Sequence, residues 1–221
     1  MLILSLDSAG AGCGASIWQD GATLAAVDER MERGQDQRLM PLILEVMQKA
    51  NRQFSDLDRI AVTRGPGSFT GLRIGLAAAR GIGLAAGKPV IGIDRFAIYR
   101  LLVQPPQKSL LVVIDSKRKE LFCRFYPAAG VAMETFLMDA PGIRTYAERK
   151  GDTVVTGDIQ MPGVGNFQAA SEKETIACAA MAAVADSKHP HFLPRPLYIR
   201  APDVTFSRPA GEGAEREARG G

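Results

Sequence analysis

The chain has 221 residues, of which 46% are hydrophobic and 23% are charged, and its formal net charge is +3. This composition is typical of a soluble globular protein with one large domain or two small ones. The mild positive charge permits contact with nucleic acid but does not predict it. No run of about 18 uncharged apolar residues occurs and the first residues lack a signal-peptide pattern, so we expect no membrane contact and a cytoplasmic location.

Strand and helix patterns alternate along the first hundred residues. We expect strands at 2–6, 13–18, 22–28, 57–63 and 90–93. Helical patterns occupy 35–51, the Ala/Leu/Gly-rich segment after residue 70, and 95–103. The dipeptide Asp20-Gly21 predicts that the second and third strands form a hairpin.

The same pattern begins again after a break at Gln104-Pro105-Pro106-Gln107. A hydrophobic strand that ends in Asp115-Ser116 repeats the first strand, which ends in Asp7-Ser8. Further strands are expected at 121–126, 131–137 and 153–156, and helices at 141–150 and 169–186. We therefore predict two related halves, residues 1–104 and 105–200, followed by a disordered tail at 201–221.

Two mixed-sheet halves flanked by helices indicate an α/β protein with a duplicated actin-like (ribonuclease H-like) fold. In such folds the first hairpin and its aspartate face a nucleotide phosphate across a cleft. Asp7 and Ser8 are therefore candidates for nucleotide contact. The alternative for Asp7 is an Asx-turn that simply ends the strand.

A rigid loop, Arg64-Gly65-Pro66-Gly67-Ser68-Phe69-Thr70, joins an apolar strand to the next helix. Its glycines allow a tight turn, Pro66 fixes one φ angle, and Ser68 or Thr70 can cap the helix. The loop lacks the lysine of a P-loop, and its glycines are spaced one residue too wide for a dinucleotide fingerprint. A structural turn is the more common explanation, but an anion could bind at the helix start, with Arg73 either solvated or in contact with it.

Small residues recur at every fourth position of that helix, at Gly71, Gly75, Ala79 and Gly83. They share one helix face, and each glycine costs roughly 1 kcal/mol relative to alanine, so a close backbone neighbour should compensate. That neighbour is either the chain's own sheet or a second subunit. Spacing alone favours the chain's own sheet.

Several enzyme classes lack their characteristic residues here. The two histidines, His189 and His191, are too close in sequence to form a helical zinc-ligand pair, so we expect no metal. No G-x-S-x-G motif supports a serine hydrolase. Cys13, Cys123 and Cys178 are far apart and are expected to be buried, reduced thiols. An ATPase or kinase of the actin-like class stays open.

Five segments form a distinctive set: Leu4-Ser5-Leu6-Asp7-Ser8, Gln37-Arg38-Leu39-Met40-Pro41, Arg64-Gly65-Pro66-Gly67-Ser68-Phe69-Thr70-Gly71-Leu72-Arg73-Ile74-Gly75, Asp115-Ser116-Lys117-Arg118-Lys119-Glu120-Leu121-Phe122 and Pro196-Leu197-Tyr198-Ile199-Arg200. In this order they resemble the bacterial TsaB (YeaZ) family of tRNA threonylcarbamoyladenosine biosynthesis proteins, over residues 1 to about 200. Gln35 stands where many members have histidine, and Ser116-Lys117 where they have Ala-Arg; both changes keep polarity.

The resemblance implies an actin-like, Hsp70-like fold and a non-catalytic subunit related to the transferase TsaD. It implies that TsaD and the ATPase TsaE are partners in transferring a threonylcarbamoyl group to N6 of the adenosine beside the anticodon, in tRNAs that read ANN codons. No cofactor is intrinsic, and ATP or ADP stays open at the complex interface. It also makes the first two helices the subunit interface, through Leu39, Ile43, Met47, Gly71, Gly75, Ala79 and Gly83.

Three alternatives are kept. The chain could be a weak ATPase or small-molecule kinase that works through Asp7 and the glycine loop. It could be a peptidase, which the missing metal ligands disfavour. It could form a regulatory homodimer through the same small-residue stripe. A stripe that binds a partner predicts that Gly75→Leu or Ala79→Leu blocks association while the monomer stays folded.

Overall fold

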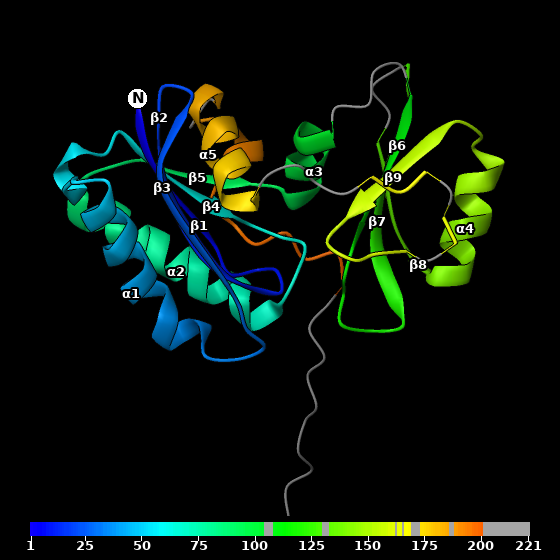
Figure 1. Ribbon diagram of the computed structural model, residues 1–221, viewed down its shortest axis with the longest axis horizontal. Helices are drawn as coiled ribbons and strands as arrows, with labels where there is room; N and C mark the ends of the chain where they lie inside the picture. The colour runs from blue at the N-terminus through cyan, green and yellow to red at the C-terminus, as the bar shows by residue number, and fades with distance from the viewer. Residues whose placement is uncertain are drawn as a thin grey trace, which may run out of the picture.

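The computed structural model describes residues 1–103, 108–129, 133–161, 163–164, 166–168, 173–185 and 188–200. Figure 1 shows two β-sheets flanked by helices, with α3 (Arg95–Val103) between them. The break expected at 104–107 and the tail expected at 201–221 lie outside the described residues. The two mixed sheets agree with the two halves predicted from the sequence.

Within the described residues the first sheet has the strand order β3-β2-β1-β4-β5. Its strands are β1 (Leu2–Asp7), β2 (Gly12–Gln19), β3 (Ala22–Arg30), β4 (Arg59–Thr63) and β5 (Val90–Ile93). The first three strands pair antiparallel. β4 pairs in parallel with β1, and β5 pairs in parallel with β4. The central strand β1 is apolar from Leu2 to Leu6 except for Ser5, as expected for a strand with both faces covered.

Helices cover the two faces of the first sheet. α1 (Gln35–Lys49) and α2 (Phe69–Ala86) lie on one face, where they pack on Leu4 and Leu6 of β1. α5 (Glu174–Val184) lies on the other face, where Ile3 points. Short 3-10 helices occupy Phe54–Asp56 and Pro190–Phe192.

The second sheet has the order β8-β7-β6-β9 among the described residues. Its strands are β6 (Ser109–Ile114), β7 (Glu120–Tyr126), β8 (Glu134–Asp139) and β9 (Thr153–Gly157). α4 (Ala140–Arg149) packs on one face, and Phe96, Tyr99 and Val103 of α3 pack on the other. Two antiparallel pairs and one parallel pair repeat the β3-β2-β1-β4 part of the first sheet. The internal repeat expected from the sequence is therefore present.

One predicted boundary needs correction. The sequence placed all of 105–200 in the second half, but α5 packs on β1, β2 and β4 of the first sheet. Its buried small residues complete the first core there: Ala177, Cys178, Ala179 and Ala182. The helix begins at Glu174 in the structure, and part of the expected 169–186 range lies outside the described residues. The chain thus returns to its first half after building the second.

Candidate functional site between the two halves

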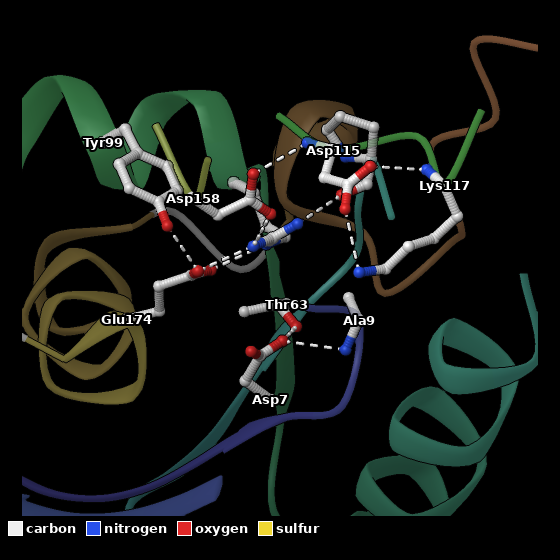
Figure 2. Close-up of polar contacts among 10 residues, drawn as sticks. Asp7, Ala9, Thr63, Tyr99, Asp115, Lys117, Asp158 and Glu174 are labelled. Atoms are coloured by element: carbon white, nitrogen blue, oxygen red, sulfur yellow. Dashed lines mark hydrogen bonds and ion pairs between the residues drawn. The ribbon is translucent and has the colours of Figure 1, made fainter. Parts of the chain in front are cut away.

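Charged side chains from both halves meet between the two sheets. Asp7 ends β1 and Arg95 begins α3, while Asp115 and Asp158 follow β6 and β9. Glu174 is the first residue of α5. Figure 2 shows the four carboxylate side chains gathered in one region. We call these five residues the interdomain cluster.

Arg95 is the centre of the interdomain cluster, with a side chain that is only 1% exposed. Its Nε and Nη2 donate to the two carboxylate oxygens of Glu174 at 2.7 and 2.6 Å. Nη2 also donates to Asp158 at 3.0 Å, and Nη1 donates to the carbonyl of Pro66 at 3.0 Å. The hydroxyl of Tyr99 donates to Glu174 at 2.7 Å. One guanidinium therefore ties the second half, through Asp158, to the first.

Opposite charges offset the burial of this cluster. Burial by itself would raise the pKa of Glu174, but the charge and hydrogen bonds of Arg95, with the hydrogen bond from Tyr99, together have the larger effect and hold that pKa below its usual value. Burial alone would lower the pKa of Arg95, but Glu174 and Asp158 hold it well above its usual value. Asp158 is itself oriented by the backbone N–H of Asp115, which donates to its Oδ1 at 2.7 Å. The cluster thus holds a buried ion pair whose members depend on each other.

Both of the repeated strands end in the same local structure. The backbone N–H of Ala9 donates to Oδ1 of Asp7 at 3.0 Å, and that of Lys117 donates to Oδ1 of Asp115 at 2.7 Å. These are Asx-turns, in which an aspartate closes the chain two residues further on. The structural alternative considered for Asp7 is therefore realised, in both halves.

Asp7 is nevertheless in an unfavourable place for a negative charge. Burial and then the Glu174 carboxylate raise the pKa of Asp7 from 3.8 to about 6. Arg95 and the Thr63 hydroxyl, which donates to Asp7, lower it only in part. Ionised Asp7 is thus a source of instability at neutral pH.

We expect Asp7→Asn to raise the free energy of unfolding at pH 7.5 by about 1–2 kcal/mol. The pKa of Asp7 is higher in the folded state than in the unfolded state. Ionisation of Asp7 therefore destabilises the fold increasingly as the pH rises from about 4 to about 6, and the full effect is present above pH 6. The side-chain oxygen of asparagine can still accept hydrogen bonds from the Ala9 N–H and the Thr63 hydroxyl, but it carries no charge. Urea unfolding at pH 7.5 and 4.5 measures the effect, and an equal gain at both pH values would contradict it.

The glycine loop packs against the first hairpin. Gly65 has a φ of +106°, a left-handed conformation that favours glycine, and the Gly65–Pro66 peptide bond is cis. A Cβ on Gly67 would lie 2.3 Å from the carbonyl oxygen of Ala9. The N–H of Ser68 donates to that same carbonyl at 2.9 Å, and the Ser68 hydroxyl caps α2 by accepting from Gly71 at 3.1 Å.

The contacts of the glycine loop occupy N–H groups that a phosphate at the start of α2 would need, where the sequence allowed an anion to bind. Two amides at the start of α2 already have partners within the chain. Arg95 is already paired with Glu174 and Asp158, and Asp7 and Asp115 add two further carboxylates to the cluster. The residues present therefore do not fit a nucleotide phosphate in this place. ATP or ADP at an interface with a partner protein stays a prediction.

The remaining predicted contact residues divide between interior and surface. Ser8 is buried, and its hydroxyl donates to the carbonyl of Gly71 at 2.8 Å. Arg64 is half-buried beneath the C-terminal segment, whose Leu197 N–H donates to its carbonyl at 2.7 Å. Thr70 and Arg73 are exposed on the first turns of α2. Ser8 and Arg64 therefore make contacts inside the protein, whereas Thr70 and Arg73 lie on its surface.

Sequence reasoning missed the residues that join the halves. Arg95, Asp158 and Glu174 are separated by 16 residues or more and belong to no local motif. The one local signal is position, because Arg95 and Glu174 both begin helices. Nothing in the sequence indicated that they meet.

The small-residue stripe of α2 faces the chain's own sheet. A Cβ on Gly71 would lie 1.9 Å from the Ser8 carbonyl oxygen, and one on Gly83 would lie 2.4 Å from Cγ2 of Val90. Ala79 is fully buried, and Gly75 is buried as well. The stripe is therefore not a free surface for a partner. This is the internal packing that helix spacing favours, and it differs from the partner surface that the family resemblance implies for these residues.

The apolar residues predicted to join the stripe are also interior. Leu39, Ile43 and Met47 of α1 are at most 4% exposed and belong to the same core. The Gly75→Leu and Ala79→Leu variants would therefore disturb the fold itself rather than an interface. The exposed sides of these two helices carry other apolar residues, which we call the helix face: Met40, Leu44 and Leu84, with exposed fractions of 41%, 55% and 87%.

All three cysteines are buried and free, as expected. No group of three or more histidine, cysteine, aspartate or glutamate side chains with the arrangement of a metal site occurs in the described part of the chain. None of the described helices has the length and apolarity that a membrane crossing requires.

Comparison with known proteins gives one family. The model of the family described as TsaD, tRNA N6-adenosine threonylcarbamoyltransferase, matches residues 27–140, just over half of the chain. The chain is 39% identical over 94 residues to the tRNA threonylcarbamoyladenosine biosynthesis protein TsaB of Escherichia coli K12, covering 42% of this chain and 40% of that one. It is 47% identical over 75 residues to the tRNA N6-adenosine threonylcarbamoyltransferase of Erythrobacter litoralis, covering 34% and 22%.

These matches are partial. The chain spans between 20% and 58% of the length of the curated relatives it matches. The solved structure of YeaZ from Pseudomonas aeruginosa covers 90% of this chain and 99% of its own, with a TM-score of 0.67 and 20% identity. That likeness shows the fold, which is the duplicated actin-like one predicted from the sequence.

Proposed function

The chain belongs to the TsaD family of tRNA N6-adenosine threonylcarbamoyltransferase proteins, and we propose that it acts there as a non-catalytic subunit. In this proposal it binds a TsaD transferase and the ATPase TsaE joins them. The complex transfers a threonylcarbamoyl group to N6 of the adenosine beside the anticodon, in tRNAs that read ANN codons, in the cytoplasm. Similarity to a relative named for tRNA threonylcarbamoyladenosine biosynthesis supports the pathway.

The helix face is the observation that carries the partnership. Leu84 is 87% exposed near the end of α2, and Leu44 is 55% exposed on the adjoining α1. Large apolar side chains gathered on neighbouring helices mark protein contact surfaces. α2 has only two charged residues, Arg73 and Arg80, and both are exposed, so charged side chains would border an apolar contact at Leu84. A transferase that shares sequence with this chain over 75 residues offers a related fold as the partner.

The interdomain cluster supports the non-catalytic part of the proposal. Arg95 joins the halves through ion pairs with the carboxylates of Glu174 and Asp158, between the two sheets. The pKa of Arg95 is held well above its usual value and that of Glu174 below its usual value, so neither group is a good acid or base near neutral pH. Arg95, Glu174 and Asp158 are thus better suited to fixing the two halves than to acid–base chemistry.

The test is threonylcarbamoyladenosine formation on tRNA, by cognate TsaD and TsaE, with and without this chain. Nucleoside analysis by mass spectrometry gives the yield. The proposal expects activity only when the chain is present at near-equimolar amounts. Unchanged activity without it would overturn the proposal, and nucleotide turnover by the chain alone, lost in Asp7→Ala, would favour the ATPase alternative.

We expect Leu44→Asp combined with Leu84→Asp to weaken binding to the transferase at least tenfold, because two charges would be buried at the contact. Val184→Asp is the matched control, since Val184 is 89% exposed at the end of α5, on the opposite side of the sheet. Isothermal titration measures the affinity. Equal binding by the double variant and the control would show that the helix face is not the contact. Sedimentation of the chain alone shows whether the same face makes a homodimer.

A further inference from the structure

Two surface grooves adjoin in front of the glycine loop. One has a volume of 540 Å³ and lies between the loop (66–69), the 116–118 turn of the second half and the C-terminal segment 197–200; we call it the loop groove. The other has a volume of 610 Å³ and lies along the first hairpin turn and residues 30–33; we call it the hairpin groove. Ser68 and Lys117 line both. The grooves therefore form one path across the two halves.

The walls of this path are strongly basic. Five cations line it: Arg30, Arg33, Lys117, Arg118 and Arg200. Glu32 is the one carboxylate among its lining residues. The whole chain carries a net charge of only +3, so positive charge is concentrated here. Lys117 pairs with Asp115 and Arg200 with Glu120, but such exposed pairs are weak in water and can exchange for a phosphate.

An aromatic stack stands in the loop groove. The guanidinium carbon of Arg73 lies 3.9 Å from the centre of the Phe69 ring. The Phe69 and Tyr198 rings are 5.2 Å apart at an interplanar angle of 34°. Tyr198 is 41% exposed although it is a large, partly apolar side chain. The supported tyrosine is therefore a preformed platform on which a planar group can stack.

We propose that the two grooves bind a single-stranded segment of RNA, with a base on Tyr198 and phosphates along the basic walls. Unpaired bases stack on aromatic side chains, whereas cations track the backbone. A path through two grooves, with cations in both, suits several successive phosphates better than one mononucleotide. The identification of that RNA as the tRNA substrate rests on the proposed function; the binding chemistry does not.

The test measures binding of fluorescent tRNA to the full chain by anisotropy, at several salt concentrations. Lys117→Ala combined with Arg118→Ala should weaken binding about tenfold or more at 0.1 M salt and make the salt dependence shallower by about 1.5 in log K against log salt. The matched control is Lys108→Ala with Arg149→Ala, which removes two exposed cations elsewhere on the second half. The control should leave both quantities unchanged.

The aromatic platform is tested separately. Tyr198→Leu should weaken binding roughly five- to hundredfold, whereas Tyr198→Phe should bind as the native chain does, because stacking needs the ring and not the hydroxyl. A shared loss in Lys117/Arg118 and Tyr198→Leu variants supports the RNA groove. An equal loss of RNA affinity in the Lys108/Arg149 control variant would show that only the overall charge matters, and it would overturn the proposed RNA groove.

Other outcomes separate this inference from the proposed function. If the full chain binds no RNA, or if the groove variants bind as the native chain does, the groove inference fails even when tRNA modification requires the chain. If the groove variants lose affinity for the transferase but not for RNA, the grooves are a protein contact and the inference is again overturned. RNA binding that depends on the grooves, without any role in modification, would support the inference and reject the proposed function.

Discussion

Replacing Arg95 by methionine is expected to lower the free energy of unfolding by about 3–5 kcal/mol at pH 7.5. In the native chain the carboxylates of Glu174 and Asp158 both pair with the Arg95 guanidinium. The substitution leaves the two carboxylates buried with no cation between them. Methionine fills much of the same space, so the loss arises from the charge and the hydrogen bonds rather than from a cavity. Urea unfolding of the full chain measures it.

Arg38→Met is the matched control for this prediction. Arg38 also makes a two-pronged contact with a carboxylate, that of Glu29, but both side chains are more than a third exposed. An exposed pair of this kind is worth about 0–1 kcal/mol. If both variants lost the same free energy, burial of the cluster would not be the cause.

The pH dependence of the Arg95 variant gives a second check. The pKa of Glu174 is held below its usual value, so its contribution to stability is present at neutral pH and is lost as the pH falls through that lowered pKa. Without Arg95 this contribution disappears. The difference between the native chain and Arg95→Met should therefore be largest at neutral pH and shrink in acid.

Gly71→Ala is expected to cost about 3 kcal/mol or more, a large effect for the addition of one methyl group. The new Cβ would lie 1.9 Å from the Ser8 carbonyl oxygen, so the backbone of the first hairpin must move away from α2. The hydrogen bond from the Ser8 hydroxyl to the Gly71 carbonyl would be disturbed as well. Thermal or urea unfolding measures the loss.

Gly81→Ala, on the same helix, should have the opposite sign. A Cβ there meets nothing within 4 Å, and alanine is the better helix former, so we expect a gain of about 0.5–1 kcal/mol. The pair of variants separates packing against the sheet from helix propensity. Equal changes in the two variants would mean that the stripe does not need its small residues for internal packing.

The sequence predicted the local elements because their signals are local. Apolar strand runs, the Asp20-Gly21 hairpin, the Ser68 or Thr70 cap of α2 and the two Asp-Ser strand ends all act within a few residues. The repeat of these signals was enough to predict two halves and the duplicated fold. The glycine loop was placed correctly between β4 and α2, and of the two expected candidates for the cap, Ser68 and Thr70, the structure uses Ser68.

The partner surface could not be predicted in the same way. A helix pattern shows that Leu39 and Leu44 lie on different faces of α1 but not which face a partner covers. Both the stripe of small residues and an apolar helix face are typical of cores and of interfaces alike. Only the position of the sheet shows that the stripe is interior and that Leu44 and Leu84 are left outside.

By itself the sequence determined the elements, their duplication and the family, since these depend on neighbours in the chain and on motifs of fixed spacing. The tertiary structure alone decided which residues meet across long separations. It brought Arg95, Asp158 and Glu174 into one buried ion pair, returned α5 to the first sheet, and placed Tyr198 against Phe69. Such contacts depend on the packing of whole elements, and no local pattern encodes the distance between two side chains that are a hundred residues apart.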